Sequence, residues 1–484
     1  MIRACVVLVA LAYTPALSAG QTPSPERQTA PPGAAAPSIE ATVQALARTI
    51  ESQQKLLEEQ GRQIEQLRRE VAEARGPGRP PAAEGGSTQP NPPPQQAGAA
   101  SPAPDDQSQP RVSEIPPDVV TAEEFPGAFK LPGSDAALRI GGLVRVNWVG
   151  TYDALLVDDR FQTSAIPIAG SPEASRGGRV NIIASPSRFN FDLRTPTGVG
   201  YMRAFIEGDF AGANNTLRLR HAYGQWRRAI FGQTWSTFSD PEAEPDGIDF
   251  EGLNAIVLFR QPQIRWSFPL GERFRMAFAL EDPRPDLTGA TGVNQVPDVV
   301  TRLRFEPRLG GHVQVSGVVR QLRGEPNEFP NEIVAATAYG INISGRLPAR
   351  LWSKRDQLLF QHNSGRGLGR YISDLGSFGG QDGVFDATTH TLRPLDVFSG
   401  YLGYEHWWSE RLRSSASFGV VGVHNLDVQP DDALHLTRRS TINFMWSPIQ
   451  RLDLVTEFLW GRRQNKDGQA GKAAQTQVGA TFRF

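Results

Sequence analysis

The amino-acid sequence predicts an all-β fold, a sixteen-stranded antiparallel transmembrane β-barrel that follows an α-helical coiled-coil segment and a disordered Pro-rich linker. Three observations predict this fold. The chain starts with an export signal, its longest part consists of short segments in which apolar and polar residues alternate, and its final strand ends on an aromatic residue. Together they predict a protein of the outer membrane of a Gram-negative bacterium.

Residues 1–20 are expected to be a secretory signal peptide. Arg3 supplies the positive charge, residues 4–17 are almost wholly apolar, and small residues follow them. The single cysteine, Cys5, lies in this segment, so we expect neither a disulfide nor a cysteine metal site in the mature protein. The formal net charge of -1 gives no reason to expect a nucleic-acid partner.

Residues 21–37 are rich in Pro, Ala and Gly and are expected to be disordered. Residues 38–75 are expected to form a periplasmic coiled coil, because apolar residues repeat there every seven positions. The predicted oligomerisation seam consists of Val43, Ile50, Leu57, Ile64, Val71, Leu46 and Leu67. A trimer and a dimer both fit this pattern, and a single amphipathic helix lying on another surface is the alternative.

A linker rich in Pro, Gly and Gln is expected over residues 76–128, and the barrel over residues 129–484. Gly76 and Pro77 end the helical pattern. The linker shows no apolar periodicity, so it should act as an extended spacer between the coiled coil and the barrel.

Two-residue alternation is the main signal for strands in the rest of the chain. In residues 188–194, Phe189, Phe191 and Leu193 alternate with charged or polar residues. A soluble β-sandwich would show the same alternation, but its polar face would mix Lys, Glu and Thr, whereas here that face is rich in arginine. The closing strand has Phe482 and Phe484 on its apolar face, an expected signal for the barrel assembly machinery.

The strand count must be even if both ends of the barrel lie in the periplasm. Sixteen segments satisfy this condition when residues 255–269 form one long strand, with Pro262 inside it. A barrel of this size can hold a water-filled channel.

Arginines dominate the inward positions that alternation assigns, mostly in the first half of the barrel. Because guanidinium groups stay charged and bind carboxylates at two points, we expect these arginines to line the pore and bind anions. They are Arg139, Arg145, Arg188, Arg194, Arg203, Arg218, Arg220, Arg265, Arg275, Arg302, Arg304 and Arg320. The alternative is that they pair with inward acids and only brace the wall.

An acidic segment, residues 232–254, follows one predicted strand and is a candidate constriction loop. Its acidic residues are Asp240, Glu242, Glu244, Asp246, Asp249 and Glu251. If the loop folds inward, it would oppose the arginines and create a transverse field. A solvated outer loop is the alternative.

Catalysis is not expected. The seven histidines are scattered, and no motif of a serine hydrolase, metalloprotease or nucleotide-binding loop is present. We expect no cofactor, no catalytic residue and no metal.

Several segments resemble the DcaP-like outer-membrane porin family, among them AFKLPGSDAALRIGGLVRVNWVGTYD, RLRHAYGQWRRAIFGQTWSTFSD, HNSGRGLGRYISDLG and WSPIQRLDLVTEFLWGRRQNKDG. The resemblance covers most of residues 128–484. It implies a homotrimeric sixteen-stranded porin with a periplasmic coiled coil, linked to uptake of small anions such as dicarboxylates. The Pro-rich linker is unusually long, so the spacing between coiled coil and barrel differs from that pattern.

The expected function is therefore passive diffusion of small hydrophilic, anionic solutes across the outer membrane. Expected partners are outer-membrane lipid, further copies of the chain, the barrel assembly machinery and small anionic solutes. The alternative is a structural anchor that couples the barrel to the periplasm or peptidoglycan through the coiled coil.

Overall fold

The protein is described over residues 125–484 by a computed structural model. The predicted signal peptide, the coiled coil with its seam residues and nearly all of the linker lie outside the described residues. Those expectations therefore stay predictions.

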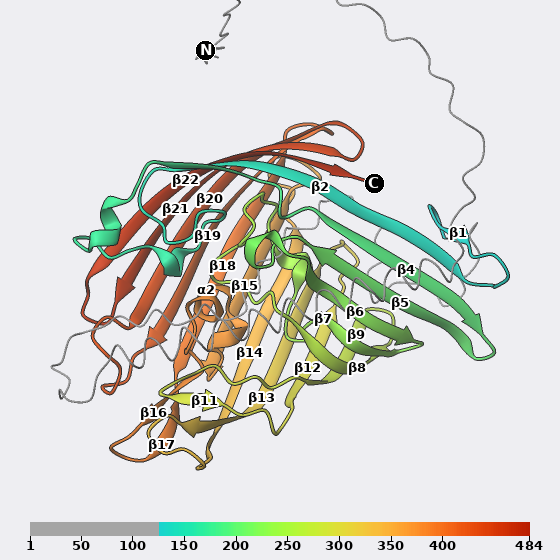
Figure 1. Ribbon diagram of the computed structural model, residues 1–484. Helices are drawn as coiled ribbons and strands as arrows, with labels where there is room; N and C mark the ends of the chain where they lie inside the picture. Colours follow the sequence, from blue (N-terminus) through green and yellow to red (C-terminus); the bar gives the residue numbers. More distant parts are fainter. Residues whose placement is uncertain (1–124) are drawn as a thin grey trace, which may run out of the picture. The chain divides into compact units, whose positions relative to one another are not determined.

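Sixteen antiparallel strands form one closed barrel, which confirms the predicted fold class. Each strand pairs with the next one around the wall, and the ring of strands is visible in Figure 1. In chain order the strands are β2 (Ala137–Thr151), β4 (Arg188–Thr197), β5 (Gly200–Asp209), β6 (Arg218–Trp226), β7 (Ala229–Trp235), β8 (Arg260–Leu270), β9 (Phe274–Glu281), β12 (Asp298–Phe305), β13 (His312–Pro326), β14 (Val334–Pro348), β15 (Gln357–Arg366), β18 (Asp396–Trp407), β19 (Leu412–His424), β20 (Leu434–Ile449), β21 (Leu452–Asn465) and β22 (Ala470–Arg483).

The barrel closes where the last strand meets the first. β22 pairs with β2 from Leu143 opposite Arg483 to Thr151 opposite Gln475. The backbone of Phe484 extends this pairing, since its N–H donates to the carbonyl of Gly142 over 3.1 Å. No edge of the main wall is left unpaired, which a lipid environment requires because it offers no hydrogen bonds to a free edge.

Connections at the two ends of the barrel alternate along the chain, and the longest ones all lie at the same end. Examples of short turns are residues 198–199, 227–228 and 450–451, and examples of long connections are 152–187, 236–259 and 367–395. The start of β2 and the end of β22 lie at the end with the short turns. This is the arrangement of outer-membrane barrels, in which short turns face the periplasm.

The two faces of the wall have opposite character. On β20 the side chains of Ile442, Phe444 and Trp446 are about half exposed, while the intervening Asn443 and Met445 are buried. Large exposed apolar side chains recur on the outer face of every neighbouring strand, and most inward positions are polar or charged. Exposure of so wide an apolar surface to water would be unfavourable, so we assign the outer face to contact with lipid.

Smaller elements lie in the connections and at the start of the barrel. They are the strands β1 (Phe129–Lys130), β3 (Arg179–Ile183), β10 (Leu287–Thr288), β11 (Ala290–Gly292), β16 (Gly383–Asp386) and β17 (Thr391–Pro394), the helix α2 (Ser373–Phe378) and the 3-10 helices Thr163–Ala165, Pro172–Ser175, Ala213–Asn215, Pro241–Ala243 and Gly369–Tyr371. Within residues 125–484, every helix is too short or too polar to cross a bilayer.

One predicted strand boundary is wrong. β8 begins at Arg260, not at residue 255. Ala255, Ile256 and Val257 are fully buried in the long connection before β8, where they pack in an apolar cluster with residues of the connection between β15 and β18. Pro262 does lie in the strand, opposite Gln233 of β7. Sequence periodicity assigned the apolar residues 255–257 to the neighbouring strand, because periodicity does not show what an apolar segment packs against.

Candidate functional site

The interior of the barrel holds the arginines that the sequence placed there. Arg145, Arg194, Arg203, Arg220, Arg265, Arg304 and Arg320 are buried. Arg139, Arg188, Arg218, Arg275 and Arg302 are partly buried. The backbone register explains this arrangement, because most of these side chains alternate with outward apolar neighbours on a pleated strand.

Carboxylates of β4 and β5 hold six of these arginines. Asp192 lies 2.7 Å from Arg203, 3.1 Å from Arg194 and 3.7 Å from Arg139. A second group consists of Glu207 and Asp209 with Arg188, Arg218 and Arg220, in which Arg220 reaches Glu207 at 2.7 Å and Asp209 at 2.8 Å. Six guanidinium groups thus contact three carboxylates on this side of the barrel.

Three other arginines are paired elsewhere in the barrel. Arg275 and Arg304 contact Glu306, and Arg304 also reaches Glu242 at 2.7 Å. Arg320 contacts Asp298 at 2.9 Å and Asp382 at 3.0 Å. Nine of the twelve predicted residues are therefore in ion pairs, which supports the bracing alternative for those nine.

Arg145, Arg265 and Arg302 make no ion pair with any residue in the range 125–484. Arg145 donates from Nε to Thr481 over 3.0 Å, but its Nη1 has no acceptor among the described residues. The buried Nε atoms of Arg265 and Arg302 likewise find no acceptor there. A buried guanidinium donor without a protein acceptor is a group that water or an anion can bind.

Arg265 and Arg302 are neighbours across one strand. Arg265 is opposite Ala279 of β9, and Arg302 is opposite Ala277 of the same strand. Both alanines are buried and face inward, between the two arginines. Alanine carries no carboxylate, so neither arginine finds an ion-pair partner at these two positions of β9.

Residues 236–259, which hold the six acids of the predicted constriction loop, contact inward side chains of the barrel wall. Figure 1 shows this connection between β7 and β8 within the ring of strands. Five of its six acidic side chains contact polar groups of the wall or of other inward segments. Arg413 binds Asp246 at 2.7 Å, Arg439 binds Asp249 at 2.8 Å, and Arg304 binds Glu242. These ion pairs therefore attach the loop to β12, β19 and β20 of the barrel wall.

The remaining three acids of the loop differ in their surroundings. Asp240 accepts a hydrogen bond from Ser344 over 2.8 Å and lies 2.8 Å from Nε2 of His312. Glu251 accepts one from Ser377 over 2.8 Å, and burial raises the pKa of Glu251 to about 7. Glu244 is buried, its Oε2 has no hydrogen-bond partner within residues 125–484, and burial raises its pKa well above the ordinary value.

Wall carboxylates that sequence reasoning missed also hold the loop. One oxygen of Glu457 accepts the backbone N–H groups of Ile248 and Asp249, each over 2.8 Å, and Glu405 accepts that of Asp246 over 2.9 Å. Arg413 and Arg439 were missed as well. Alternation along β18 to β21 places all four side chains inward, so the signal was present in the second half of the barrel.

Two further connections fold inward, which the sequence did not predict. The segment that contains α2 donates backbone hydrogen bonds from Ser373 to Ile256 and from Asp374 to Asn254. Residues 152–166 follow the wall of β21 and β22, where Phe161 packs on Leu459. The interior is therefore narrowed by three connections that contact one another.

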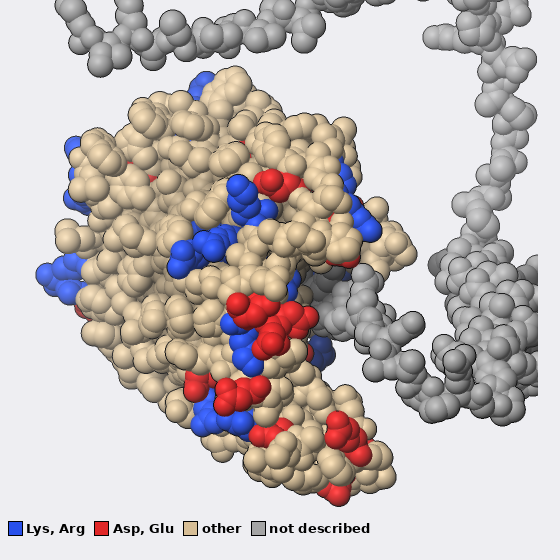
Figure 2. Space-filling model, turned by 90° about the vertical axis from the view of Figure 1, so that its left-hand side faces the viewer, with Lys and Arg blue, Asp and Glu red and all other residues tan. Residues whose placement is uncertain are grey.

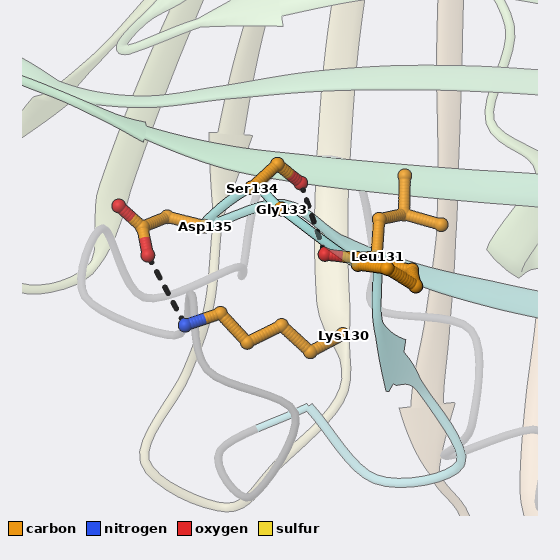
Figure 3. Close-up of a pocket in the computed structure, with 6 residues that line it drawn as sticks. Lys130, Leu131, Gly133, Ser134 and Asp135 are labelled. Carbon is orange, nitrogen blue, oxygen red and sulfur yellow. Dashed lines mark hydrogen bonds and ion pairs between the residues drawn. The ribbon is translucent and has the colours of Figure 1, made fainter.

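Two other features carry no part of this site. A small surface pocket is formed by the turn 130–135, where Lys130 and Asp135 form an exposed ion pair over 3.1 Å (Figure 3). It contains none of the predicted site residues. Within residues 125–484, no group of three or more His, Cys, Asp or Glu side chains is arranged to hold a metal ion.

The sequence profile of the family described as DcaP outer membrane protein matches residues 133–484. Among solved structures, the chain is similar to the outer membrane channel DcaP of Acinetobacter baumannii, with 21% identity, 74% of this chain and 100% of that chain covered, and a TM-score of 0.65. This likeness shows the shared fold.

Weaker structural likenesses join this chain to other barrels. An anion-selective porin from Comamonas acidovorans is 11% identical over 72% of this chain and 100% of its own, with a TM-score of 0.47. OmpF of Salmonella typhi, in complex with daunomycin, is 10% identical over 74% of this chain and 100% of its own, with a TM-score of 0.48. No curated protein matches the sequence closely enough to count as a relative.

Proposed function

The chain belongs to the DcaP outer membrane protein family, an outer-membrane porin family, and from this premise we propose that it is a passive channel for small hydrophilic anions. The observation that carries the proposal is the pair Arg265 and Arg302. Both side chains face the interior, neither forms an ion pair within residues 125–484, and each has a buried Nε donor without an acceptor there.

The surrounding charges support a preference for anions. On the inner faces of β4 to β6, five arginines accompany three carboxylates. Three of the six acids of the loop 236–259 form ion pairs with Arg304, Arg413 and Arg439. In a narrow passage with low-dielectric walls, such an excess raises the local concentration of anions.

We further propose dicarboxylates as the favoured class of solute. β8 and β12 are separated by one strand, so the backbones that carry Arg265 and Arg302 lie roughly 10 Å apart. Long arginine side chains can close part of that distance. Each guanidinium group can bind one carboxylate at two points, so a small molecule with two carboxylates can bridge the pair.

The loop 236–259 is proposed to form the constriction beside this pair. Arg304 of β12 binds Glu242, which brings the loop close to the strand that also carries Arg302. A solute that passes the loop on this side would meet both unpaired arginines. The hydrogen bonds to Glu405 and Glu457 keep the loop at a fixed height in the barrel.

Current block by succinate tests the proposal. We expect succinate on one side of a planar bilayer to interrupt the chloride current of the full-length protein, and R265Q/R302Q to lose this block while the channel still conducts. Arg350 and Lys354 serve as a matched control. Both are exposed in the connection between β14 and β15, at the end of the barrel with the short turns. R350Q/K354Q should keep the block. Equal block in R265Q/R302Q would contradict the assignment of this pair.

Assembly and partners are also part of the proposal. The coiled coil predicted over residues 38–75 would join three copies in the periplasm, and outer-membrane lipid would surround the barrels. Phe482 and Phe484 are about half exposed at the end of the last strand, where the assembly machinery could read them. We propose no enzymatic activity.

One observation favours the alternative of a structural anchor. The three inward connections occupy part of the interior, and Leu253, Ile256 and Leu375 form an apolar cluster there. If that packing closes the passage, the barrel would anchor the periplasmic segment without conducting. A bilayer recording without any chloride current would support this alternative.

A further inference from the structure

Three basic residues stand side by side on the outer wall of the barrel. Arg438 of β20 is directly opposite Arg462 of β21, and Arg462 is directly opposite Lys472 of β22. All three side chains are exposed, whereas their chain neighbours Arg439, Gly461 and Ala473 are buried on the inner face. They therefore form one row across three strands and point away from the channel. We name Arg438, Arg462 and Lys472 the basic row.

No described residue neutralises the basic row. None of the three side chains forms an ion pair or hydrogen bond with any residue in the range 125–484. Like charges directly opposite one another on neighbouring strands destabilise a sheet. A cost of this kind is offset when a ligand of opposite charge binds across the row.

The position of the row in the membrane follows from the strands below it. Towards the periplasmic end, the outward positions of β20 are Ser440 and then Ile442, Phe444 and Trp446. From Arg438 to Trp446 the strand rises roughly 27 Å, which is roughly 20 Å of membrane height for the usual strand tilt. The apolar band of such barrels is about 25 Å tall, so the basic row lies near its outer boundary.

The long-connection end of the barrel as a whole is not uniformly basic. Figure 2 views the side of the molecule on which β21 ends in Figure 1, and it shows Asp and Glu side chains gathered in the lower half beside Lys and Arg. The basic row differs because it combines three positive charges in register with the lipid-facing wall beneath them. Its ligand must therefore offer negative charge at the level of the lipid headgroups.

A second copy of the chain is a poorer partner. Within residues 125–484, the outward positions of the barrel strands carry two carboxylates, Glu325 and Asp396. Glu325 accepts the backbone N–H of Asn331 over 2.8 Å, and Asp396 lies 3.9 Å from Arg366. The outer wall thus offers no matching row of acids to a neighbouring copy.

We propose that the basic row binds the phosphate groups of the outer-leaflet lipid, which are the anions present at this height of the outer membrane. Arginine binds phosphate oxygens at two points, and lysine adds a point charge. Trp460 also faces outward and is opposite Ser440, two residues closer to the periplasmic end than Arg462. It offers an apolar surface to the acyl chains of the same lipid. This inference does not depend on what the channel conducts.

Lipopolysaccharide binding to the full-length protein in mild detergent tests the proposal. We expect R438Q/R462Q/K472Q to bind lipopolysaccharide roughly a hundredfold more weakly, from about fivefold for each basic residue near an anionic lipid surface. The matched control is R350Q/K354Q/R355Q, which removes the same charge from exposed positions at the opposite end of the barrel and should bind normally. Lipopolysaccharide treated with phosphatase should bind the wild type as weakly as it binds the triple variant.

Several outcomes would overturn the proposal. The first is an unchanged affinity of the triple variant for lipopolysaccharide. The second is competition by inorganic phosphate that is as strong as competition by the lipid. The third is a changed number of copies per particle while lipid binding stays the same. If the triple variant does not assemble, two other variants decide. R438K/R462K keeps the charges and should bind normally, and R462Q alone should lose about fivefold in affinity. A normal affinity in R462Q would then contradict the proposal.

Discussion

The arginines of β4 to β6 and those of β8 and β12 face the same interior but have different neighbours. Arg203 and Arg220 are held by Asp192, Glu207 and Asp209 on strands next to their own. Arg265 and Arg302 instead lie beside alanines of β9. The first group braces the wall, and we propose that the second group is left for solute. The role of an inward arginine therefore depends on whether the neighbouring strand carries a carboxylate or a small apolar residue, and not only on the direction of its side chain.

This comparison predicts a large loss of stability for R220Q. Removal of the Arg220 guanidinium takes away the contacts at 2.7 Å and 2.8 Å with Glu207 and Asp209, both of which are buried. Breaking a buried ion pair from one side costs about 3–5 kcal/mol, because a buried charge is left without its partner. We expect the free energy of unfolding in urea, measured in detergent micelles, to fall by about this amount.

R302Q is the matched variant for that experiment. It removes a partly buried guanidinium that has no carboxylate partner within residues 125–484, so no buried acid is left unpaired. The free energy of unfolding should change by less than about 1 kcal/mol. Equal destabilisation by R302Q and R220Q would erase the distinction between the two groups.

The hydrogen bonds of Glu457 predict a smaller effect on the inward loop. E457A leaves the backbone N–H groups of Ile248 and Asp249 without their acceptor, and an unsatisfied buried donor costs about 1–3 kcal/mol. We expect the loop to detach locally, which should raise single-channel conductance and current noise. E457Q retains an acceptor oxygen and should behave much more like the wild type. Identical recordings for E457A and wild type would show that this tether does not hold the loop.

Protonation of the loop predicts a mild pH dependence. The pKa of Glu251 is raised to about 7 by burial, so this carboxyl loses its negative charge as the pH falls from about 8 to about 6. The interior becomes more positive, and the ratio of anion to cation permeability should rise roughly twofold. E251Q should abolish this change. If E251Q shows the wild-type pH profile, another group must cause it.

Alternation, together with the condition of an even strand count, predicted the sixteen strands, and alternation assigned the arginines to the polar face. Phe189, Phe191 and Leu193 show why, since in lipid each outward position must be apolar and the period cannot slip without exposing polar groups to the bilayer. The same alternation places Arg413 and Arg439 on the inward face of β19 and β20, in the second half of the barrel.

The inward connections could not be predicted in the same way. The acidic pattern of residues 240–251 allowed either an inward or an outer loop, because only the facing strands decide which carboxylates find a partner. The segment around α2 carries Leu368, Ile372 and Leu375, whose burial depends on contacts with a loop more than one hundred residues earlier in the chain. Local periodicity holds no information about such distant contacts.

The most direct test is the reversal potential of the full-length protein in a planar bilayer under a salt gradient. In the wild type, the sign of the reversal potential should indicate a preference for anions. In R265Q/R302Q, the reversal potential should shift clearly towards zero. R350Q/K354Q should retain the wild-type value. A cation preference in the wild type, or an unchanged reversal potential in R265Q/R302Q, would contradict the claim that these two unpaired arginines set the selectivity of the channel.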